Sequence, residues 1–230
     1  MRSALVSVVA GVALSPAGSA DLADGFLRIT KSTTWTEVSA ERLPFRTFHP
    51  QGMVKSGDRI YLSSVEVVDR ANAKGVGHLF EMELGGKLLR SIKLGEGPIY
   101  HPGGIDTDGS HLWVPLAEYR PGGTTIIYRV DMTTLEARAA FRFHDHLGAI
   151  VCDTTNHQLV GVNWGSRRFY RWAMNGDGTA PIDPEHPESL DNSSHYIDYQ
   201  DGFHIKDSVF ALFCGFSQYR FGGGAFALGG

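Results

Sequence analysis

The sequence predicts an all-β fold, a β-propeller of four-stranded blades, on three observations. Four segments of 18 residues align without gaps, and their first residues lie 52, 45 and 53 positions apart. Runs rich in β-branched and aromatic residues alternate with Gly, Asp and Asn turns, as in propeller blades. Helical repeats of this period would need long stretches with 3.6-residue periodicity, and we find none. The four segments are HPQGMVKSGDRIYLSSVE (49–66), HPGGIDTDGSHLWVPLAE (101–118), HLGAIVCDTTNHQLVGVN (146–163) and YQDGFHIKDSVFALFCGF (199–216).

A polar break divides each segment into the two strands of a hairpin. The breaks contain residue types that tolerate positive φ or bond to their own backbone in tight turns. They fall at residues 56–58, 106–109, 153–156 and 206–207. Further strand-forming stretches follow at residues 77–94, 124–143 and 167–178. Each repeat therefore predicts one blade, and about four blades are present.

The two ends of the sequence bear on how the ring closes. Residues 34–45 (TWTEVSAERLPF) resemble the outermost strand of a blade, and the final AFALGG resembles a third strand with no fourth after it. In one account the N-terminal strand completes a closed four-bladed ring. In the other, which we favour because four blades are the lower limit of the fold, the chain is truncated from a five- or six-bladed propeller. We expect the propeller domain to cover residues 21–230, incomplete at its C-terminus.

The first twenty residues, MRSALVSVVAGVALSPAGSA, have the pattern of a signal peptide. Arg2 precedes an apolar run that ends at Leu14, and small residues suitable for signal peptidase follow. The run is shorter than the roughly 20 residues that span a bilayer. We therefore expect cleavage after Ala20, no membrane span in the mature chain, and a secreted or periplasmic protein. Export would permit a disulfide between Cys152 and Cys214, although two free thiols fit the sequence equally well.

The charge balance excludes one class of partner. The chain has 21 Lys and Arg against 25 Asp and Glu, a formal net charge of −4, and no run of basic residues. We therefore expect no nucleic-acid binding. Separately, we expect a monomer that can bind a small molecule. Ten histidines and 28 glycines indicate many turns and a polar or metal-binding site.

The first and last residues of the repeats are predicted to meet across each hairpin. Opposite residues in an antiparallel hairpin have numbers with a constant sum, and their Cβ atoms lie about 5 Å apart. The pairs that centre on the predicted turns are His49 with Glu66, His101 with Glu118, and His146 with Asn163. Since inner strands line the channel of a propeller, the three histidines would surround its mouth. The fourth repeat has Tyr199 and Phe216 at these positions, with Asp201 nearby.

A ring of imidazoles backed by carboxylates suits a divalent metal. Such a site takes neutral nitrogen ligands and acceptors behind them that fix the tautomer. The alternative is that His-Pro-x-Gly is a structural corner, whose imidazole bonds to a neighbouring blade or to its own glutamate. The candidate metal ligands are His49, His101, His146, Asn163 and Asp201, and the candidate catalytic bases are Glu66 and Glu118.

Arginines follow each hairpin and indicate a substrate-binding rim. Their loops leave the face that carries the histidines, where they could bind a carboxylate or phosphate bidentately. Ion pairs between blades are the alternative. These arginines are Arg70, Arg120, Arg167, Arg168 and Arg220. We assign Trp113, Trp164 and Trp172 to blade packing rather than to a sugar platform.

Several motifs together resemble a domain-of-unknown-function family of exported β-propeller proteins. They are HPQGM…SSVE, GPIYHPGGIDTDGSHLWVPLAEYRPGG, GVNWGSRRFYRW and YIDYQDGF, which extend over the mature chain. The resemblance implies a propeller that continues beyond the present C-terminus, and it carries no assigned reaction.

More distantly, the blades resemble propellers of the gluconolactonase and strictosidine-synthase type. That resemblance implies a divalent metal held by Glu, Asn and Asp side chains, for which this chain offers Glu66 or Glu118, Asn163 and Asp201. The histidines depart from that pattern. Two hypotheses follow: an exported metal-dependent hydrolase or lyase acting on a small anionic or sugar-derived substrate, and a non-catalytic propeller that binds a ligand or protein through the same face.

Overall fold

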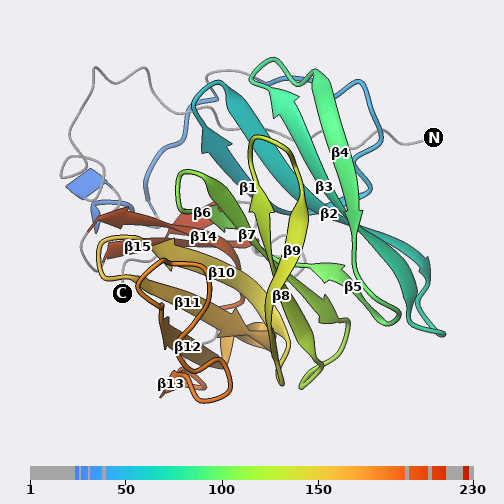
Figure 1. Cartoon of the computed structure of the whole chain (residues 1–230). Coiled ribbons are helices and arrows are strands. Elements are labelled where there is room, and N and C mark those ends of the chain that lie inside the picture. Colours follow the sequence, from blue (N-terminus) through green and yellow to red (C-terminus); the bar gives the residue numbers. More distant parts are fainter. Residues whose placement is uncertain are drawn as a thin grey trace.

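The computed structural model describes residues 24–25, 27–30, 32–37, 40–194, 197–206, 209–215 and 225–227. The expected signal peptide, Phe216 and Arg220 lie outside them. The described chain forms four antiparallel sheets that follow one another along the sequence (Figure 1). This confirms the predicted propeller fold, and we number the sheets as blades 1 to 4.

Blades 1 and 2 each run outward from an inner strand near the middle of the molecule. Blade 1 has the order β1 (His49–Ser56), β2 (Arg59–Asp69), β3 (Lys74–Glu83) and β4 (Leu88–Leu94). In blade 2 the inner strand is split into β5 (Ile99–Pro102) and β6 (Asp106–Thr107), which both pair with β7 (His111–Glu118), followed by β8 (Thr125–Asp131) and β9 (Ala137–Phe143).

Blades 3 and 4 repeat the pattern with differences in their outer strands. Blade 3 has β10 (Leu147–Asp153), β11 (Gln158–Asn163), β12 (Arg168–Ala173) and β13 (Glu188–Asp191). A loop with Pro181, Pro184 and Pro187 separates its last two strands, since proline cannot donate to a sheet ladder. Blade 4 has the order β14 (Tyr199–Lys206), β15 (Val209–Gly215) and β16 (Ala225–Ala227).

Apolar layers hold neighbouring blades together. One cluster joins blades 1 and 2 and includes Leu79, Ile105 and Leu116. Another joins blades 2 and 3 around Trp113 and Trp172, both almost fully buried. These two tryptophans therefore pack between blades, as predicted.

The inner strands meet at a point that we call the hub. Asp201 on β14 accepts hydrogen bonds from the backbone N–H of Met53 (2.8 Å) in blade 1 and of Ile105 (3.1 Å) in blade 2. Asp106 in blade 2 accepts from the N–H of Cys152 (2.9 Å) in blade 3 and of His204 (3.3 Å) in blade 4. Two carboxylates thus connect all four blades.

The backbones approach each other closely at the hub because glycines occupy the crossing points. A Cβ at Gly52 would lie 2.6 Å from Cα of Gly104, and a Cβ at Gly104 would lie 2.6 Å from Cα of Asp201. Gly104 also exchanges backbone bonds with blade 3, donating to the Gly148 carbonyl (2.9 Å) and accepting from the N–H of Ile150 (3.2 Å). Larger side chains here would separate the inner strands.

Two further expectations are resolved by the fold. The described residues of the segment 34–45 form no strand, so the predicted N-terminal strand is wrong; Leu43 and Phe45 pack instead on the outer face of blade 1, against Ile60 and Phe80. Cys152 is a buried free thiol, which corrects the disulfide alternative. Among the described residues, no helix is long and apolar enough to cross a membrane.

Candidate functional site

The predicted pairs of histidine and glutamate are offset by one residue. His49 lies opposite Val65, and His101 lies opposite Ala117, because a β-bulge interrupts each inner strand. In blade 3, Asn163 faces Leu147 rather than His146. The prediction of direct cross-strand pairing is therefore wrong. The offset arises at the hub, where the glycine backbones of neighbouring blades approach so closely that a regular ladder of hydrogen bonds cannot form.

The bulge in blade 1 is stabilised by a buried serine. Ser63 Oγ accepts a hydrogen bond from the N–H of Gly52 (2.9 Å) and donates to the carbonyl of Gly103 (2.7 Å). The side chain thus satisfies groups that the interrupted ladder leaves open, and it does so across the boundary between blades 1 and 2.

The two predicted catalytic bases turn away from the histidines with which they were paired. The Glu66 carboxylate lies 3.3 Å from Nε2 of His78, a buried ring stacked between Phe48 and Phe80. The Glu118 carboxylate forms an ion pair with Arg120 in the turn from β7 to β8. These partners are not His49 and His101, and the role of the two glutamates as bases stays a prediction.

Two of the predicted histidines do meet, in a cluster of rings that we call the platform. His101 stacks on Tyr119 with 4.5 Å between ring centroids, and it lies 6.0 Å from His146. Trp164, directly after β11, packs edge-on against His146 at 4.7 Å and against Tyr119 at 5.3 Å. The platform comprises His101, Tyr119, His146 and Trp164, and it spans blades 2 and 3 on the face where the inner strands begin.

The imidazoles of the platform are held in the neutral form. Burial is the main cause that lowers the pKa of His101 to about 3. The charges that His146, His49 and Arg70 carry or can acquire lower it further. Burial also lowers the pKa of His146. At neutral pH both rings therefore offer one donor and one acceptor nitrogen.

A backbone carbonyl fixes the orientation and the tautomer of the His146 ring. Its Nδ1 lies 2.7 Å from the carbonyl oxygen of Glu118, so Nδ1 carries the proton and donates, which leaves Nε2 as the acceptor. Asp145 supports the same turn, accepting hydrogen bonds from the N–H of His146 (2.8 Å), Nδ2 of Asn163 (2.9 Å) and the hydroxyl of Tyr170 (2.7 Å).

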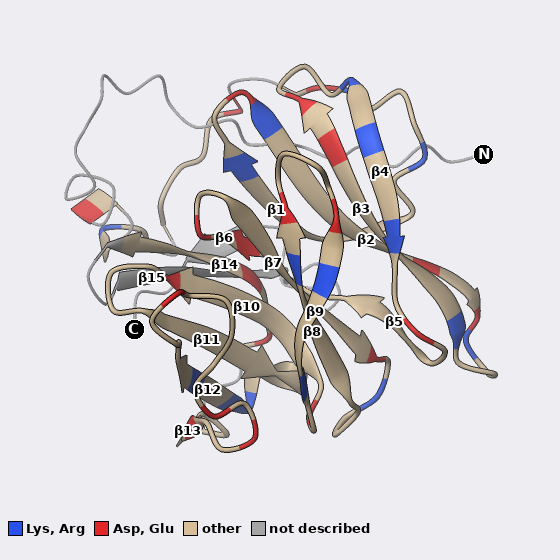
Figure 2. Ribbon diagram, viewed as in Figure 1, with Lys and Arg blue, Asp and Glu red and all other residues tan. Residues whose placement is uncertain are grey.

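The predicted arginine rim is only partly assembled. Arg70 lies over the ring of Tyr119, with 4.6 Å from its guanidinium carbon to the ring centroid. Arg120 is committed to Glu118. Arg167 is half-buried and Arg168 is exposed, while the N–H of Arg168 bonds to Asn163 Oδ1 (2.8 Å). Basic and acidic residues are interspersed over the sheets (Figure 2).

The five predicted metal ligands do not converge. Asp201 is in the hub, where both its oxygens accept backbone hydrogen bonds. Both ends of the Asn163 amide are used by Asp145 and Arg168. His49 is exposed at the start of β1. Within the described part of the chain, no three His, Cys, Asp or Glu side chains are grouped to hold a metal ion. Of the predicted set, the rings of His101 and His146 lie 6.0 Å apart, and His49 is near enough for its charge to act on His101.

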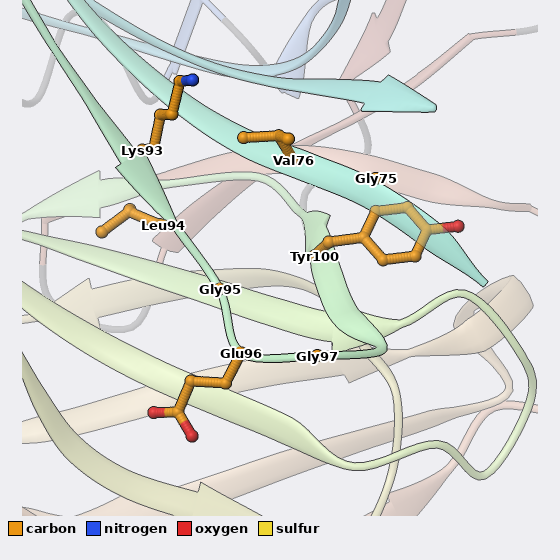
Figure 3. A pocket seen from close by; sticks show the side chains of 8 residues that line it. All are labelled: Gly75, Val76, Lys93, Leu94, Gly95, Glu96, Gly97 and Tyr100. Carbon is orange, nitrogen blue, oxygen red and sulfur yellow. The ribbon is translucent and has the colours of Figure 1, made fainter. Parts of the chain in front are cut away.

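A pocket of about 240 Å³ is lined by residues of blade 1, of the segment that connects it to blade 2, and by Tyr100 of blade 2 (Figure 3). Tyr100, which precedes His101 on β5, forms one wall and packs so closely on Gly75 that a Cβ there would lie 2.2 Å from its ring. Lys93 and Glu96 line the pocket, and Glu96 is bonded to Arg142 at 2.5 Å. Few free polar groups therefore point into it.

Tyr119 and Trp164 are the residues of the platform that the sequence analysis did not place in the candidate site. Trp164 was assigned to blade packing, yet it is half-buried at the face, unlike Trp113 and Trp172. Their positions carried a usable pattern, because both residues directly follow the last residue of an aligned repeat. Aromatic residues at that point of two successive blades would be brought to one face.

The comparisons with known proteins establish the family. The model of the Family of unknown function (DUF6454) matches residues 10–230, and the chain belongs to that family. The predicted membership of a family without an assigned reaction is thereby confirmed. No curated protein matches the chain.

Solved structures with similar coordinates include several propellers. A chain of the nidogen/laminin complex is 15% identical, with a TM-score of 0.47 over 72% of this chain and 55% of that chain. The β-propeller domain of Cps50 (Swd1) from Myceliophteria thermophila is 12% identical, with a TM-score of 0.43 over 73% and 51%. The β-propeller domain of the trilobed protease from Pyrococcus furiosus is 11% identical, with a TM-score of 0.45 over 74% and 49%. The chain thus spans about half the length of these structures.

Proposed function

We propose that this propeller binds a small, sugar-derived molecule at the platform. The observation that carries the proposal is the grouping of Trp164, His101 and His146 from two blades at one face. A half-exposed indole offers an apolar surface for the carbon-bound face of a sugar ring. Nε2 of the neutral His146 ring beside it offers an acceptor for a hydroxyl group.

Titration with sugars tests the proposal. Binding of D-glucuronate and D-glucose to the full chain is measured by ligand-observed NMR. Trp164→Ala should weaken binding about 3- to 10-fold, because it removes an aromatic contact of about 1 kcal/mol. The matched control is Trp35→Ala, since Trp35 is 56% exposed and lies outside the platform. Equal binding by both variants would contradict the proposal, as would no binding of either sugar.

A metal-dependent hydrolase or lyase at the same face is the second candidate. It is favoured by one observation: the bond from Nδ1 of His146 to the Glu118 carbonyl orients the ring as in protein metal sites, with Nε2 available to a cation. His101 would be the second ligand. A bound metal would polarise the substrate or activate water, but two histidines fall short of the three protein ligands usual in catalytic zinc sites.

Metal analysis separates the two candidates. The protein is purified without chelators and its metal content is measured, together with the melting temperature in Zn²⁺, Mn²⁺ and Ca²⁺ for the wild type and for His101→Ala. Stoichiometric metal, or a rise in melting temperature that His101→Ala abolishes, would favour the second candidate. Absence of both effects would leave the binding function.

We also propose that the protein is exported. The support is the charged, apolar and small-residue pattern of its first twenty residues. Expression in a bacterial host, followed by N-terminal sequencing of the periplasmic fraction, should give a chain that begins at Asp21. A chain that retains Met1 and stays in the cytoplasm would contradict export.

A further inference from the structure

Arg70 places a fixed positive charge at the edge of the platform. It lies in the turn that connects β2 to β3, in blade 1, and it reaches the ring of Tyr119 in blade 2. A side-chain hydrogen bond with Tyr119 is the main cause that raises the pKa of Arg70. The guanidinium is therefore both charged and oriented, and the residue is exposed to solvent.

The carboxylates close to Arg70 in the chain or beside the platform are used by other groups. Asp69, its neighbour in sequence, accepts bonds from the N–H (3.2 Å) and Nδ2 (2.7 Å) of Asn72. Glu66 faces His78, and Glu118 faces Arg120. No acidic residue is among the groups that act on the guanidinium of Arg70. The cation consequently lacks an anionic partner among the described residues.

The imidazoles near Arg70 do not offset its positive charge. At neutral pH the rings of His101 and His146 are uncharged, because burial lowers the pKa of both. The carboxylate of Asp145, the residue before His146, is occupied by His146 N–H, Asn163 and Tyr170. A region of this kind attracts an anion.

We propose that Arg70 binds a carboxylate of the ligand, and that the ligand class is therefore a sugar acid. The proposal rests on the proposed function and adds the charge of the ligand and the residue that recognises it. A guanidinium presents two parallel N–H donors that match both oxygens of a carboxylate. The ring of the same molecule would lie over the platform, against Trp164.

Arg120 provides a matched control for Arg70. Both arginines occupy the turn after the second strand of their blade, and both are exposed. Arg120 differs because it already has a carboxylate partner in Glu118. Removing its charge should therefore leave binding of an anionic ligand nearly unchanged, although the net charge of the protein changes equally.

Calorimetric titration of the full chain with three probes tests the proposal. D-glucuronate has both ring and carboxylate, D-glucose has the ring alone, and acetate has the carboxylate alone. We expect D-glucuronate to bind most tightly. Arg70→Gln should weaken its binding about 10- to 100-fold, the usual effect of losing a charged hydrogen-bond partner, and should leave D-glucose unaffected. Arg70→Lys should lie between wild type and Arg70→Gln, and Arg120→Gln should match wild type.

The possible outcomes separate this proposal from the proposed function. If D-glucose binds as tightly as D-glucuronate, or if Arg70→Gln weakens both sugars equally, the inference on Arg70 is overturned while binding of sugars stands. If acetate binds as tightly as D-glucuronate and Arg70→Gln removes both, Arg70 binds carboxylates but the sugar-binding function fails. If no probe binds, both proposals fail.

Discussion

The hub and the platform both contain buried polar groups, but they use them differently. In the hub, Asp201 and Asp106 each accept hydrogen bonds from the backbones of two other blades, and both oxygens of Asp201 are engaged. In the platform, His146 Nδ1 bonds to the Glu118 carbonyl and His101 bonds to the backbone of Pro102, while Tyr119 and Trp164 contact the imidazoles through their rings. Saturated groups hold the fold together, whereas a group with an unused acceptor, such as Nε2 of His146, can bind a ligand.

The largest expected effect is on the hub. Asp201→Ala leaves the N–H groups of Met53 and of the fully buried Ile105 without acceptors, opens space among the inner strands, and a buried group without a partner alone costs about 1–3 kcal/mol. We expect the free energy of unfolding in urea to fall by about 3 kcal/mol or more. Glu136→Ala, which removes a carboxylate of a residue exposed in the turn between β8 and β9, should change it by less than about 0.5 kcal/mol. Similar small losses in both variants would show that the hub does not hold the blades together.

The pH dependence of stability should have opposite signs in the two regions. Burial raises the pKa of Asp201 to about 8 and that of Asp106 to about 6. A carboxyl group whose pKa is raised by folding stabilises the protein at low pH, and this contribution is lost as pH rises through the folded pKa. Burial lowers the pKa of His101 and His146, so their contribution is present above pH 6.5 and is lost as pH falls.

Between pH 6.5 and 8, only the hub should therefore affect stability. We expect the free energy of unfolding to decrease over this interval by up to about 2 kcal/mol, since each pH unit below the folded pKa is worth about 1.4 kcal/mol. Urea titrations at pH 6.5 and 8 measure it. Asp201→Asn, which cannot ionise, should remove most of this decrease. An unchanged decrease in that variant would show that other groups cause the pH dependence of the unfolding free energy.

A smaller loss is expected where a side chain supports the bulge in blade 1. Ser63→Ala removes the acceptor for Gly52 N–H and the donor to the Gly103 carbonyl. Because Ser63 is fully buried, we expect a loss of about 1–2 kcal/mol in unfolding free energy. Ser63→Thr keeps the hydroxyl and should restore part of it if space for the methyl group exists. No loss in Ser63→Ala would mean that the bulge needs no side-chain support.

The smallest effect on stability is expected in the platform. Tyr119→Phe keeps the ring beside His101 and removes only the hydroxyl that bonds to Arg70. The melting temperature should stay within about 2 °C of wild type, because one hydrogen bond between a partly exposed tyrosine and an exposed arginine contributes little. Binding of D-glucuronate should nevertheless weaken a few-fold, because Arg70 loses its orientation. A large drop in melting temperature would contradict this expectation and would show that the Tyr119 hydroxyl stabilises the fold.

The strands and their turns were predictable from the sequence because they depend on local patterns. Alternating apolar residues and turn residues such as Gly57 and Gly109, both with positive φ in the structure, recur at a regular spacing. The register of the inner strands was not predictable, because the bulges follow from Gly52 and Gly104 packing on Asp201, which is distant in sequence. Long-range packing also decided that Asp201 belongs to the hub rather than to the site at the face.

The candidate site was predictable in part, because two of its residues occupy the same position of the repeat. His101 and His146 share a repeat position, and the repeat carried both to one face. The pairing of the glutamates with the histidines was wrong, since a shift of one residue in a strand turns a side chain to the other face of the sheet. The Glu118 carboxylate instead forms an ion pair with Arg120, two residues further along the chain. Alignment of repeats locates a face, but it does not determine which neighbours are in contact there.

The backbone bonds of Gly104 with Gly148 and Ile150 have a kinetic consequence. They tie the inner strand of blade 2, which carries His101, to β10, which directly follows His146, so backbone hydrogen bonds link the supports of the two rings. A ligand would then meet a surface that is already in its binding shape. Association should follow a single exponential whose rate constant rises linearly with ligand concentration and shows no plateau from a slow rearrangement, and a change in affinity between ligands should appear in the rate of dissociation.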